Sequence, residues 1–385
     1  MKKDDMKNDL EKVLNQLFSN RELNDAEAGK RALEIESYLI GHGGIVMAAS
    51  CEEGILLVSV NPQDEKSIFQ VYHRIALLGR GRAKDCNEIH RLALSSAYST
   101  GITLSKADIN VRDIVKGISE ELDSNFSYLR GRRGPYKADF IVTELGFSPE
   151  EDFLDMINFC GASSFKEQSR KSRLGIIETP TIQRVITTKK QPVKDNEGKI
   201  VKDEKGNIKI QDVPCLVETF SRPVSSGIFA LIGDIVAGKG VVESIREIAL
   251  FIGLMLRLLD ERRGTLEMAY LDREMLKKTK SEERRFHHIW QRVTNPNPNK
   301  PTNPWQDWKK FVAPAYKQAK EGKISSKLKI LIDFYEIVEE ELDPRDPGDG
   351  NLLKKMEPQK IYSANYNFVM NLFAPESKKE DNDNK

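Results

Sequence analysis

Cysteine is scarce in this sequence, with 4 residues among 385. None lies in a CxxC pair, the spacing typical of zinc ligands and redox motifs; the four are Cys51, Cys86, Cys160 and Cys215. We interpret each as a reduced, buried thiol, a use of cysteine that suits a reducing compartment. The scarcity therefore predicts no disulfide framework and no metal centre, and it favours a cytoplasmic protein.

The sequence also lacks a long apolar run and an excess of charge of either sign. No stretch approaches the roughly 18 uncharged apolar residues of a membrane-spanning helix, and residues 1–12 contain no apolar run. Charged residues make up 31% of the chain, yet the formal net charge is +1. Because no strong field surrounds such a chain, we expect neither a nucleic-acid partner nor a membrane partner, and we expect a soluble protein.

Residues 1–24 predict an amphipathic segment ahead of the main domain. Apolar side chains recur there at helical spacing between charged ones: Leu10, Val13, Leu14, Leu17 and Phe18. Asp25 is then placed to cap a second helix, which extends to Ile40 and is ended by the glycine-rich residues 41–44.

The next segments indicate an antiparallel sheet with helices laid on it. Apolar runs at 45–50 and 54–62 predict one buried hairpin, and residues 67–71 and 74–79 predict a second pair of strands. Two helices follow, with Asp85 and Asp108 expected to cap or open them, before a strand at 138–145. Strands, then two helices, then strands is an order typical of the α+β class.

The second half of the chain divides by composition. Residues 181–188 and 213–220 predict a third hairpin around a charged, exposed insertion at about 190–212, and 225–236 and 241–259 predict two buried helices. We place the main domain at 25–290, a Pro- and Asn-rich linker at 291–303, a helical extension at 304–375 and a disordered tail at 376–385.

Taken in order, these segments resemble the proteasome alpha-subunit family, in particular its bacterial type. The likeness rests on GHGGIVMAASCEEGILLVSVNP at 41–62, SIFQVYHRIALLGRGRAKD at 67–85 and KADFIVTELG at 137–146. It continues in GTLEMAYLD at 264–272, with a basic stretch and RRFHHI after it. The charged insertion and the C-terminal extension depart from the family.

The resemblance implies a fold and an assembly. The fold is a four-layer α/β/β/α sandwich of the N-terminal-nucleophile hydrolase type, with helices on both faces of two antiparallel sheets. The assembly is a homo-oligomeric, heptameric ring that joins a catalytic beta-type proteasome subunit, receives a regulatory ATPase or another activator, and admits protein substrates.

The resemblance also allows catalysis to be examined position by position. Catalytic beta-type relatives use an N-terminal Thr, helped by an Asp and a Lys on the following strands. These positions fall at Gly44, Val60 and Ser67, which offer no nucleophile, no orienting carboxylate and no ammonium group. The sequence therefore predicts a non-catalytic gating subunit that needs no cofactor and no metal.

In alpha subunits of this family, a lysine after the Asn-Pro bend receives the C-terminal carboxylate of an activator. The resemblance places that lysine at Ser67, so either the strand has a bulge or Lys66, Arg80 or Arg82 takes over the salt bridge. Gly81 lies just before the first long helix, where backbone donors suit an anion. An ordinary exposed lysine at 66 and a tight turn at Gly81 are the plain alternatives.

Other interpretations stay open. The segment Gly233–Gly240 nearly matches the phosphate loop, although Gly240 replaces the magnesium-binding hydroxyl and a turn between helices explains the glycines. The alternative functions are a stand-alone N-terminal-nucleophile-type hydrolase and a nucleotide-binding regulator using that loop. We interpret His287 and His288 as surface residues and not as a metal site. Arg130, Arg132 and Arg133 are interpreted as a solvated loop and not as a nucleic-acid contact. Trp305 and Trp308 are interpreted as anchors that dock the extension on the domain and not as a ligand site.

Overall fold

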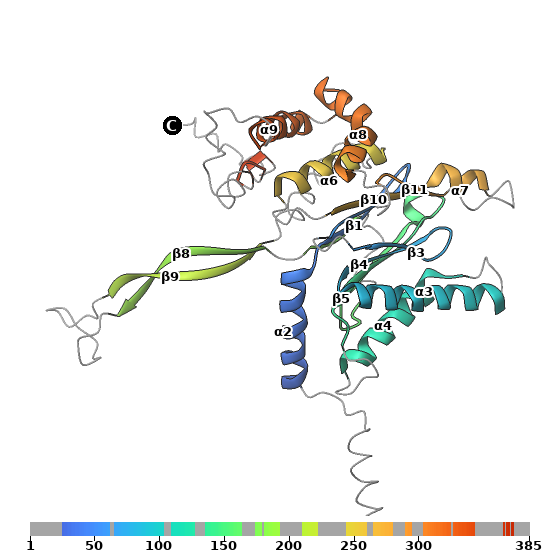
Figure 1. Ribbon diagram of the computed structural model, residues 1–385, viewed down its shortest axis with the longest axis horizontal. Coiled ribbons are helices and arrows are strands. Elements are labelled where there is room, and N and C mark those ends of the chain that lie inside the picture. The colour runs from blue at the N-terminus through green and yellow to red at the C-terminus, as the bar shows by residue number, and fades with distance from the viewer. Residues whose placement is uncertain are drawn as a thin grey trace, which may run out of the picture. The chain divides into compact units, whose positions relative to one another are not determined.

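The computed structural model describes fifteen stretches of the chain and divides it into two compact units (Figure 1). The units are residues 1–179 with 224–385, and residues 180–223. The described residues are 25–61, 65–103, 109–127, 135–163, 174–178, 181–192, 210–221, 244–259, 265–279, 289–294, 303–324, 326–342, and 365, 367–369 and 371–372. The predicted gate segment, Arg130–Arg133, the 225–236 helix, Gly233–Gly240 and the two adjacent histidines lie outside them.

The first sheet of the larger unit is antiparallel throughout and has the order β11-β10-β2-β1-β7. The predicted hairpin at its centre is confirmed, since Ile45 lies opposite Val60 and Cys51 opposite Gly54. Gly54 has φ +153, and a Cβ there would lie 1.9 Å from the Leu271 carbonyl oxygen, so this turn requires glycine. The strands are β1 (Ile45–Cys51), β2 (Gly54–Asn61), β7 (Leu174–Glu178), β10 (Thr265–Asp272) and β11 (Trp290–Arg292).

The second sheet has the order β3-β4-β5-β6 and is also antiparallel. Its members are β3 (Ile68–Gln70), β4 (Ile75–Gly81), β5 (Ala138–Glu144) and β6 (Phe153–Ile157), with the 3-10 turn η2 (Pro149–Glu151) before β6. The second predicted strand pair is β3 with β4, and their register is continuous from Ile68↔Leu78 to Gln70↔Ala76.

Alternation along the strands explains how the two sheets are buried. Ile45, Met47 and Ala49 of β1 join one apolar cluster, whereas Val46 and Ala48 join a different cluster that reaches the second sheet. Successive strand residues point to opposite faces, so β1 is covered on both sides and is apolar throughout. A third cluster lies between the other face of the second sheet and two helices, α3 (Ala83–Thr103) and α4 (Val111–Ser127).

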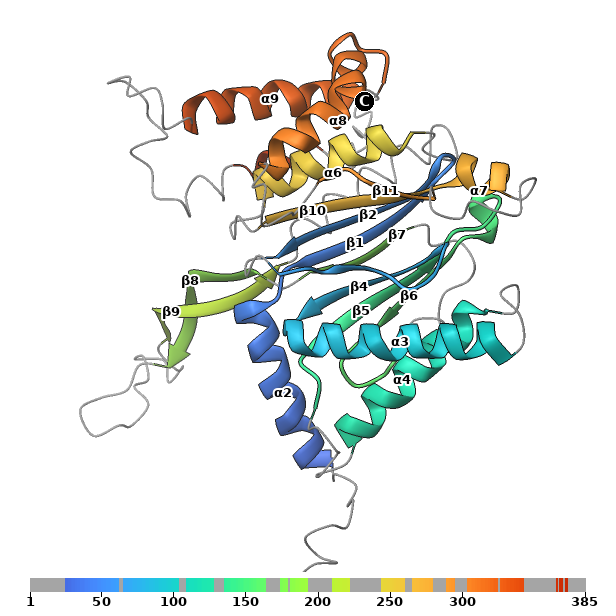
Figure 2. The same ribbon diagram turned by 45° about the vertical axis from the view of Figure 1, so that its right-hand side comes forward.

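Helices also cover the outer face of the first sheet (Figure 2). The cluster on that face combines β1, β2 and β10 with α6 (Ile245–Leu259), α8 (Pro304–Lys320) and α9 (Ser326–Leu342). Thus the C-terminal extension packs against α6 of its own chain. The helices α2 (Asp25–His42), ahead of β1, and α7 (Arg273–Thr279), after β10, complete this unit's named elements within the described residues.

The predicted helix cap at Asp85 is wrong because other partners take its carboxylate. The Asp85 carboxylate accepts hydrogen bonds from the Arg82 guanidinium and from the Lys137 backbone N–H at 2.8 Å, so it braces a neighbouring strand. The helix α4 begins after Asn110, whose Oδ1 accepts the Arg112 N–H at 3.0 Å. Asp108, the residue expected to open this helix, lies outside the described residues.

The smaller unit is a two-stranded ribbon formed by β8 (Thr181–Pro192) and β9 (Ile210–Ser221). Their pairing runs without interruption from Thr181↔Ser221 to Pro192↔Ile210. The predicted hairpin therefore continues into the charged segment. The compact unit, residues 180–223, covers more of the sequence than the predicted insertion at about 190–212. In the part of the chain that the structure describes, no helix is long and apolar enough to cross a membrane.

Candidate functional site

The position aligned with the catalytic threonine has no room for a side chain. Gly44 is buried where the chain enters β1, and a Cβ there would lie 1.9 Å from the Val60 carbonyl oxygen. A real Cβ never approaches backbone so closely, so any larger residue would displace a strand. Val60 itself belongs to the apolar cluster under α6. This end of the sheet is therefore packed as core.

Ser67 is also buried, and its surroundings are fixed by a carboxylate. Oε2 of Glu267 on β10 accepts the backbone N–H of Ser67 at 2.9 Å and that of Ile68 at 3.1 Å. The Ser67 hydroxyl accepts a hydrogen bond from Asn61 Nδ2 at 3.1 Å. Burial raises the pKa of Glu267, and the two N–H groups and Lys66 partly oppose that shift.

The hydrogen bonds from Ser67 and Ile68 to Glu267 fix the backbone here, and the two neighbouring side chains Lys66 and Ser67 differ in their exposure to solvent. Ser67 is directed into the protein with 3% of its surface exposed, whereas Lys66 is exposed. The β3–β4 register begins one residue after Ser67 and is regular over its three pairs, from Ile68↔Leu78 to Gln70↔Ala76. A cation is consequently available here from Lys66 and not from the position aligned with the family's lysine.

Lys66 lies beside an aromatic pair. Its Nζ is 5.3 Å from the centroid of the Phe69 ring, and the ring of His90 on α3 is 4.7 Å from the same centroid. His90 Nε2 lies 3.0 Å from the Gln70 carbonyl oxygen. A carbonyl can only accept, so Nε2 carries a proton and donates it there. The β3–α3 contact thus holds two basic side chains around one buried ring.

Arg80 is committed to the interior. Its Nη2 forms an ion pair with Asp139 Oδ2 on the adjacent strand β5, and both side chains are under one tenth exposed. Asp139 Oδ1 also accepts the Phe159 backbone N–H at 3.0 Å. Since the pair is buried and its carboxylate is engaged twice, Arg80 is a poor receptor for an incoming carboxylate.

Arg82 and Gly81 form a turn between β4 and α3. Arg82 donates from Nε and Nη2 to the two carboxylate oxygens of Asp85, at 2.9 and 2.7 Å, and this bonding raises the pKa of the guanidinium. The Arg82 backbone N–H donates a hydrogen bond to the Lys137 carbonyl oxygen at 2.9 Å. Gly81 has φ +128, and a Cβ there would lie 2.2 Å from that same oxygen. Glycine is therefore required by the turn, which accounts for it without an anion.

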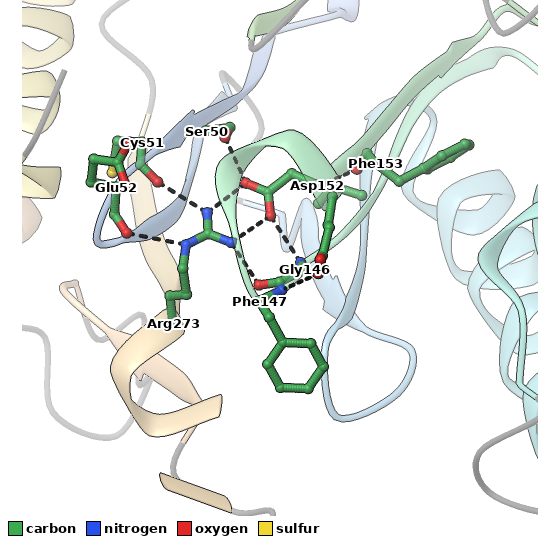
Figure 3. A network of polar contacts seen from close by, with 10 residues as sticks. Ser50, Cys51, Glu52, Gly146, Phe147, Asp152, Phe153 and Arg273 are labelled. Atoms are coloured by element: carbon green, nitrogen blue, oxygen red, sulfur yellow. Dashed lines mark hydrogen bonds and ion pairs between the residues drawn. The ribbon is translucent and has the colours of Figure 1, made fainter. Parts of the chain in front are cut away.

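One buried polar network, centred on Arg273, was missed by sequence reasoning. Arg273, the first residue of α7, forms a bidentate ion pair with Asp152, and both side chains are 1% exposed (Figure 3). The Ser50 hydroxyl and the Gly146 backbone N–H also donate to Asp152. The network ties the β1–β2 turn to the loop before β6, so it is structural and leaves no donor of the guanidinium for a ligand.

Together, these features define a class of protein: two antiparallel sheets with helices on their outer faces, no nucleophile at Gly44 and an exposed lysine shortly before β3. Comparison with known proteins agrees with this class. No model of a protein family matches the chain. Its curated relatives are proteasome alpha subunits, which confirms the predicted resemblance.

The matches cover part of each protein. The chain is 26% identical to the proteasome subunit alpha of Arthrobacter sp. (strain FB24) over 124 residues, 32% of this chain and 52% of that protein. The same subunit of Pseudarthrobacter chlorophenolicus is 26% identical over 32% of this chain and 51% of its own length. That of Streptomyces coelicolor is 25% identical over 29% and 44%. The chain thus spans about half the length of the first two curated relatives.

Proposed function

We propose that the chain is a non-catalytic alpha-type subunit of a proteasome core particle, in the outer ring that admits protein substrates and docks regulators. The observation that carries the proposal is the similarity to several proteasome alpha subunits. The proposed fold is the four-layer α/β/β/α sandwich of N-terminal-nucleophile hydrolases. Three successive apolar clusters, outside, between and beyond the two sheets, support it.

The packing around Gly44 supports the non-catalytic part of the proposal. A stand-alone N-terminal-nucleophile-type hydrolase would need a Ser, Thr or Cys at the start of β1, where the Val60 carbonyl leaves no space for a side chain. The nucleotide-binding alternative rests on residues outside the described part of the chain, and no observation favours it.

The partners follow from the same proposal. The chain forms a heptameric homo-oligomeric ring in the cytoplasm, joins a catalytic beta-type subunit and receives a regulatory ATPase or another activator. Of the proposed docking residues, Lys66 fits a carboxylate best. Arg80 is buried against Asp139, Arg82 is paired with Asp85, and Gly81 serves the turn. The exposed Lys66 ammonium lies beside the Phe69 ring, and Glu267 fixes the backbone of the next residue, Ser67.

Ring assembly is the first test. Expressed alone or with a beta-type subunit from the same genome, the full chain is expected to sediment as a ring or as stacked rings. Analytical ultracentrifugation and electron microscopy measure this directly. A chain that remains monomeric in both conditions, at concentrations well above those of the cell, contradicts the proposal.

Gating is the second test. Deletion of residues 2–20 is expected to raise peptide hydrolysis by the assembled particle, because the apolar stripe from Leu10 to Phe18 is proposed to close the axial pore. Replacement of its five apolar residues by serine should have the same effect at unchanged length. Equal hydrolysis by intact and deleted particles, with assembly verified by sedimentation, would rule out a gate in this segment.

A further inference from the structure

We infer that the Lys66 docking position is a pH-responsive carboxylate site, where Lys66 binds the C-terminal carboxylate of a partner and the protonation of His90 and Glu267 sets the affinity. The inference rests on the proposed docking function and adds its regulation. Its basis is a juxtaposition of side chains from three elements. Lys66 precedes β3, His90 lies on α3 and Glu267 lies on β10.

The geometry brings the three groups to one place. Lys66 and His90 both lie against the Phe69 ring, at 5.3 and 4.7 Å from its centroid. Glu267 binds the N–H groups of the two residues that follow Lys66. Lys66 interacts electrostatically with both of the other groups, since its positive charge acts to lower the pKa of His90 and that of Glu267. A change in the charge of His90 or of Glu267 therefore changes the affinity of the Lys66 position for a carboxylate.

His90 is the group that can gain a charge. Its pKa lies below the ordinary value of 6.5, first because of burial and then because of the charges of Lys66 and Arg91, while the Gln70 carbonyl partly opposes these effects. Since Nε2–H already donates to that carbonyl, Nδ1 is the nitrogen that takes up the second proton. Acidification thus adds a positive charge beside the Phe69 ring without removing the hydrogen bond.

Glu267 is the group that can lose a charge. Burial raises its pKa above the ordinary value of 4.5, so protonation begins at a higher pH than for an exposed glutamate. Arg292 on the neighbouring strand and the two N–H groups oppose the shift. Glu65, the other charged residue described just before β3, also acts on α3, since its charge contributes to the raised pKa of Cys86. It stays exposed to solvent.

The two titrations act in the same direction. Burial lowers the pKa of His90 and raises that of Glu267, so both groups take up a proton as pH falls into the mildly acidic range: His90 becomes cationic and Glu267 becomes neutral. A peptide C-terminus titrates near 3.3–3.7, so it stays anionic over this range. Attraction at Lys66 therefore rises on acidification, and docking is tighter at low pH than at neutral pH.

The test uses the purified full chain and an array of heptapeptides of varied sequence, each present with a free C-terminal carboxylate and as the C-terminal amide. Binding is measured at pH 5.5 and 7.5. For peptides that need the free carboxylate, wild type is expected to bind about two- to fivefold tighter at pH 5.5, the size of a solvated ion pair. His90→Gln should lose most of that difference, and His73→Gln, at the other end of β3, should keep it.

The outcomes separate the two claims. Carboxylate-dependent binding that is lost in Lys66→Ala but does not change between the two pH values overturns the pH response and leaves docking intact. Binding that ignores the carboxylate, or that survives Lys66→Ala unchanged, overturns docking at Lys66 and the inference with it. A pH response preserved in both His90→Gln and Glu267→Gln assigns it to other groups and also overturns the inference.

Discussion

Replacing Trp308 by alanine is expected to lower the free energy of unfolding by about 3–5 kcal/mol, the range for removing a large buried aromatic side chain. Trp308 is 1% exposed and donates its Nε1–H to the Ala249 carbonyl oxygen on α6 at 2.8 Å. The indole lies against the backbone of α6 at Gly253, where a Cβ would come 2.2 Å from the ring. The residue therefore joins α8 to α6 by both packing and a hydrogen bond.

Urea unfolding followed by circular dichroism measures the loss. Trp305→Ala is the matched control. Trp305 is only partly buried, with Arg257 4.9 Å from its ring centroid, so we expect a smaller loss of about 1 kcal/mol. Gly253→Ala should destabilise the chain strongly, and less so when combined with Trp308→Ala, because the clash is then removed. Equal midpoints for wild type and Trp308→Ala would mean that α8 does not belong to the core.

The composition of α6 explains why the extension is needed. Twelve of its residues are buried, on every side of the helix: Ile245, Ile248, Ala249, Leu250, Phe251, Ile252, Gly253, Leu254, Met255, Leu256, Leu258 and Leu259. A helix that is apolar all round must be covered on all faces. The first sheet covers one side and α8 and α9 cover another, so a chain ending at Gln291 would leave α6 exposed.

Elements with a strong local pattern could be predicted from the sequence. The runs 45–50 and 54–62 are apolar because β1 and β2 are covered on both faces, and the Glu52–Gly54 turn is local. The helical spacing of apolar residues in α4 predicts its buried face in the same way: Val111, Ile114, Val115, Ile118 and Leu122 are buried, and Phe126 at its end is partly buried. These predictions hold because the spacing of apolar residues along a segment shows directly which faces of its strand or helix are buried.

Side-chain partners distant in the chain could not be predicted. Asp85 is well placed to cap a helix, but Lys137, 52 residues away, presents a backbone donor that only the folded β5 supplies. Glu267 looks like an ordinary strand residue, yet it fixes Ser67 across a separation of 200 residues. Such contacts depend on how the sheets pack, so local propensity gives no sign of them.

The Arg273–Asp152 pair is the clearest case, and it carries the second large expected effect. Arg273→Met should lower the free energy of unfolding by about 3–5 kcal/mol, because the Asp152 carboxylate would remain buried without its counter-charge. In the intact chain every N–H of the guanidinium is used. Nε donates to the Glu52 carbonyl, Nη1 to Gly146 and Asp152, and Nη2 to Cys51 and Asp152, at 2.6–3.1 Å.

This arrangement also predicts how variants combine. Arg273→Lys should be nearly as harmful as Arg273→Met, since an ammonium cannot form the two parallel bonds to Asp152. Asp152→Asn should cost less alone than Arg273→Met, and adding it to Arg273→Met should recover stability by removing the unpaired charge. Lys278→Met, at the exposed pair with Glu274 on the same helix, serves as the control and should leave the unfolding transition unchanged.

The measurement is urea unfolding of the five variants, the double variant included, at low and high salt. A buried pair is screened little by ions, so the Arg273→Met loss should persist at about 1 M salt. If Arg273→Met unfolds at the wild-type midpoint, the β1–β2 turn and the loop before β6 are held together by other contacts. If the loss instead becomes smaller at high salt, the Arg273–Asp152 pair is accessible to solvent, which contradicts the buried pair described above.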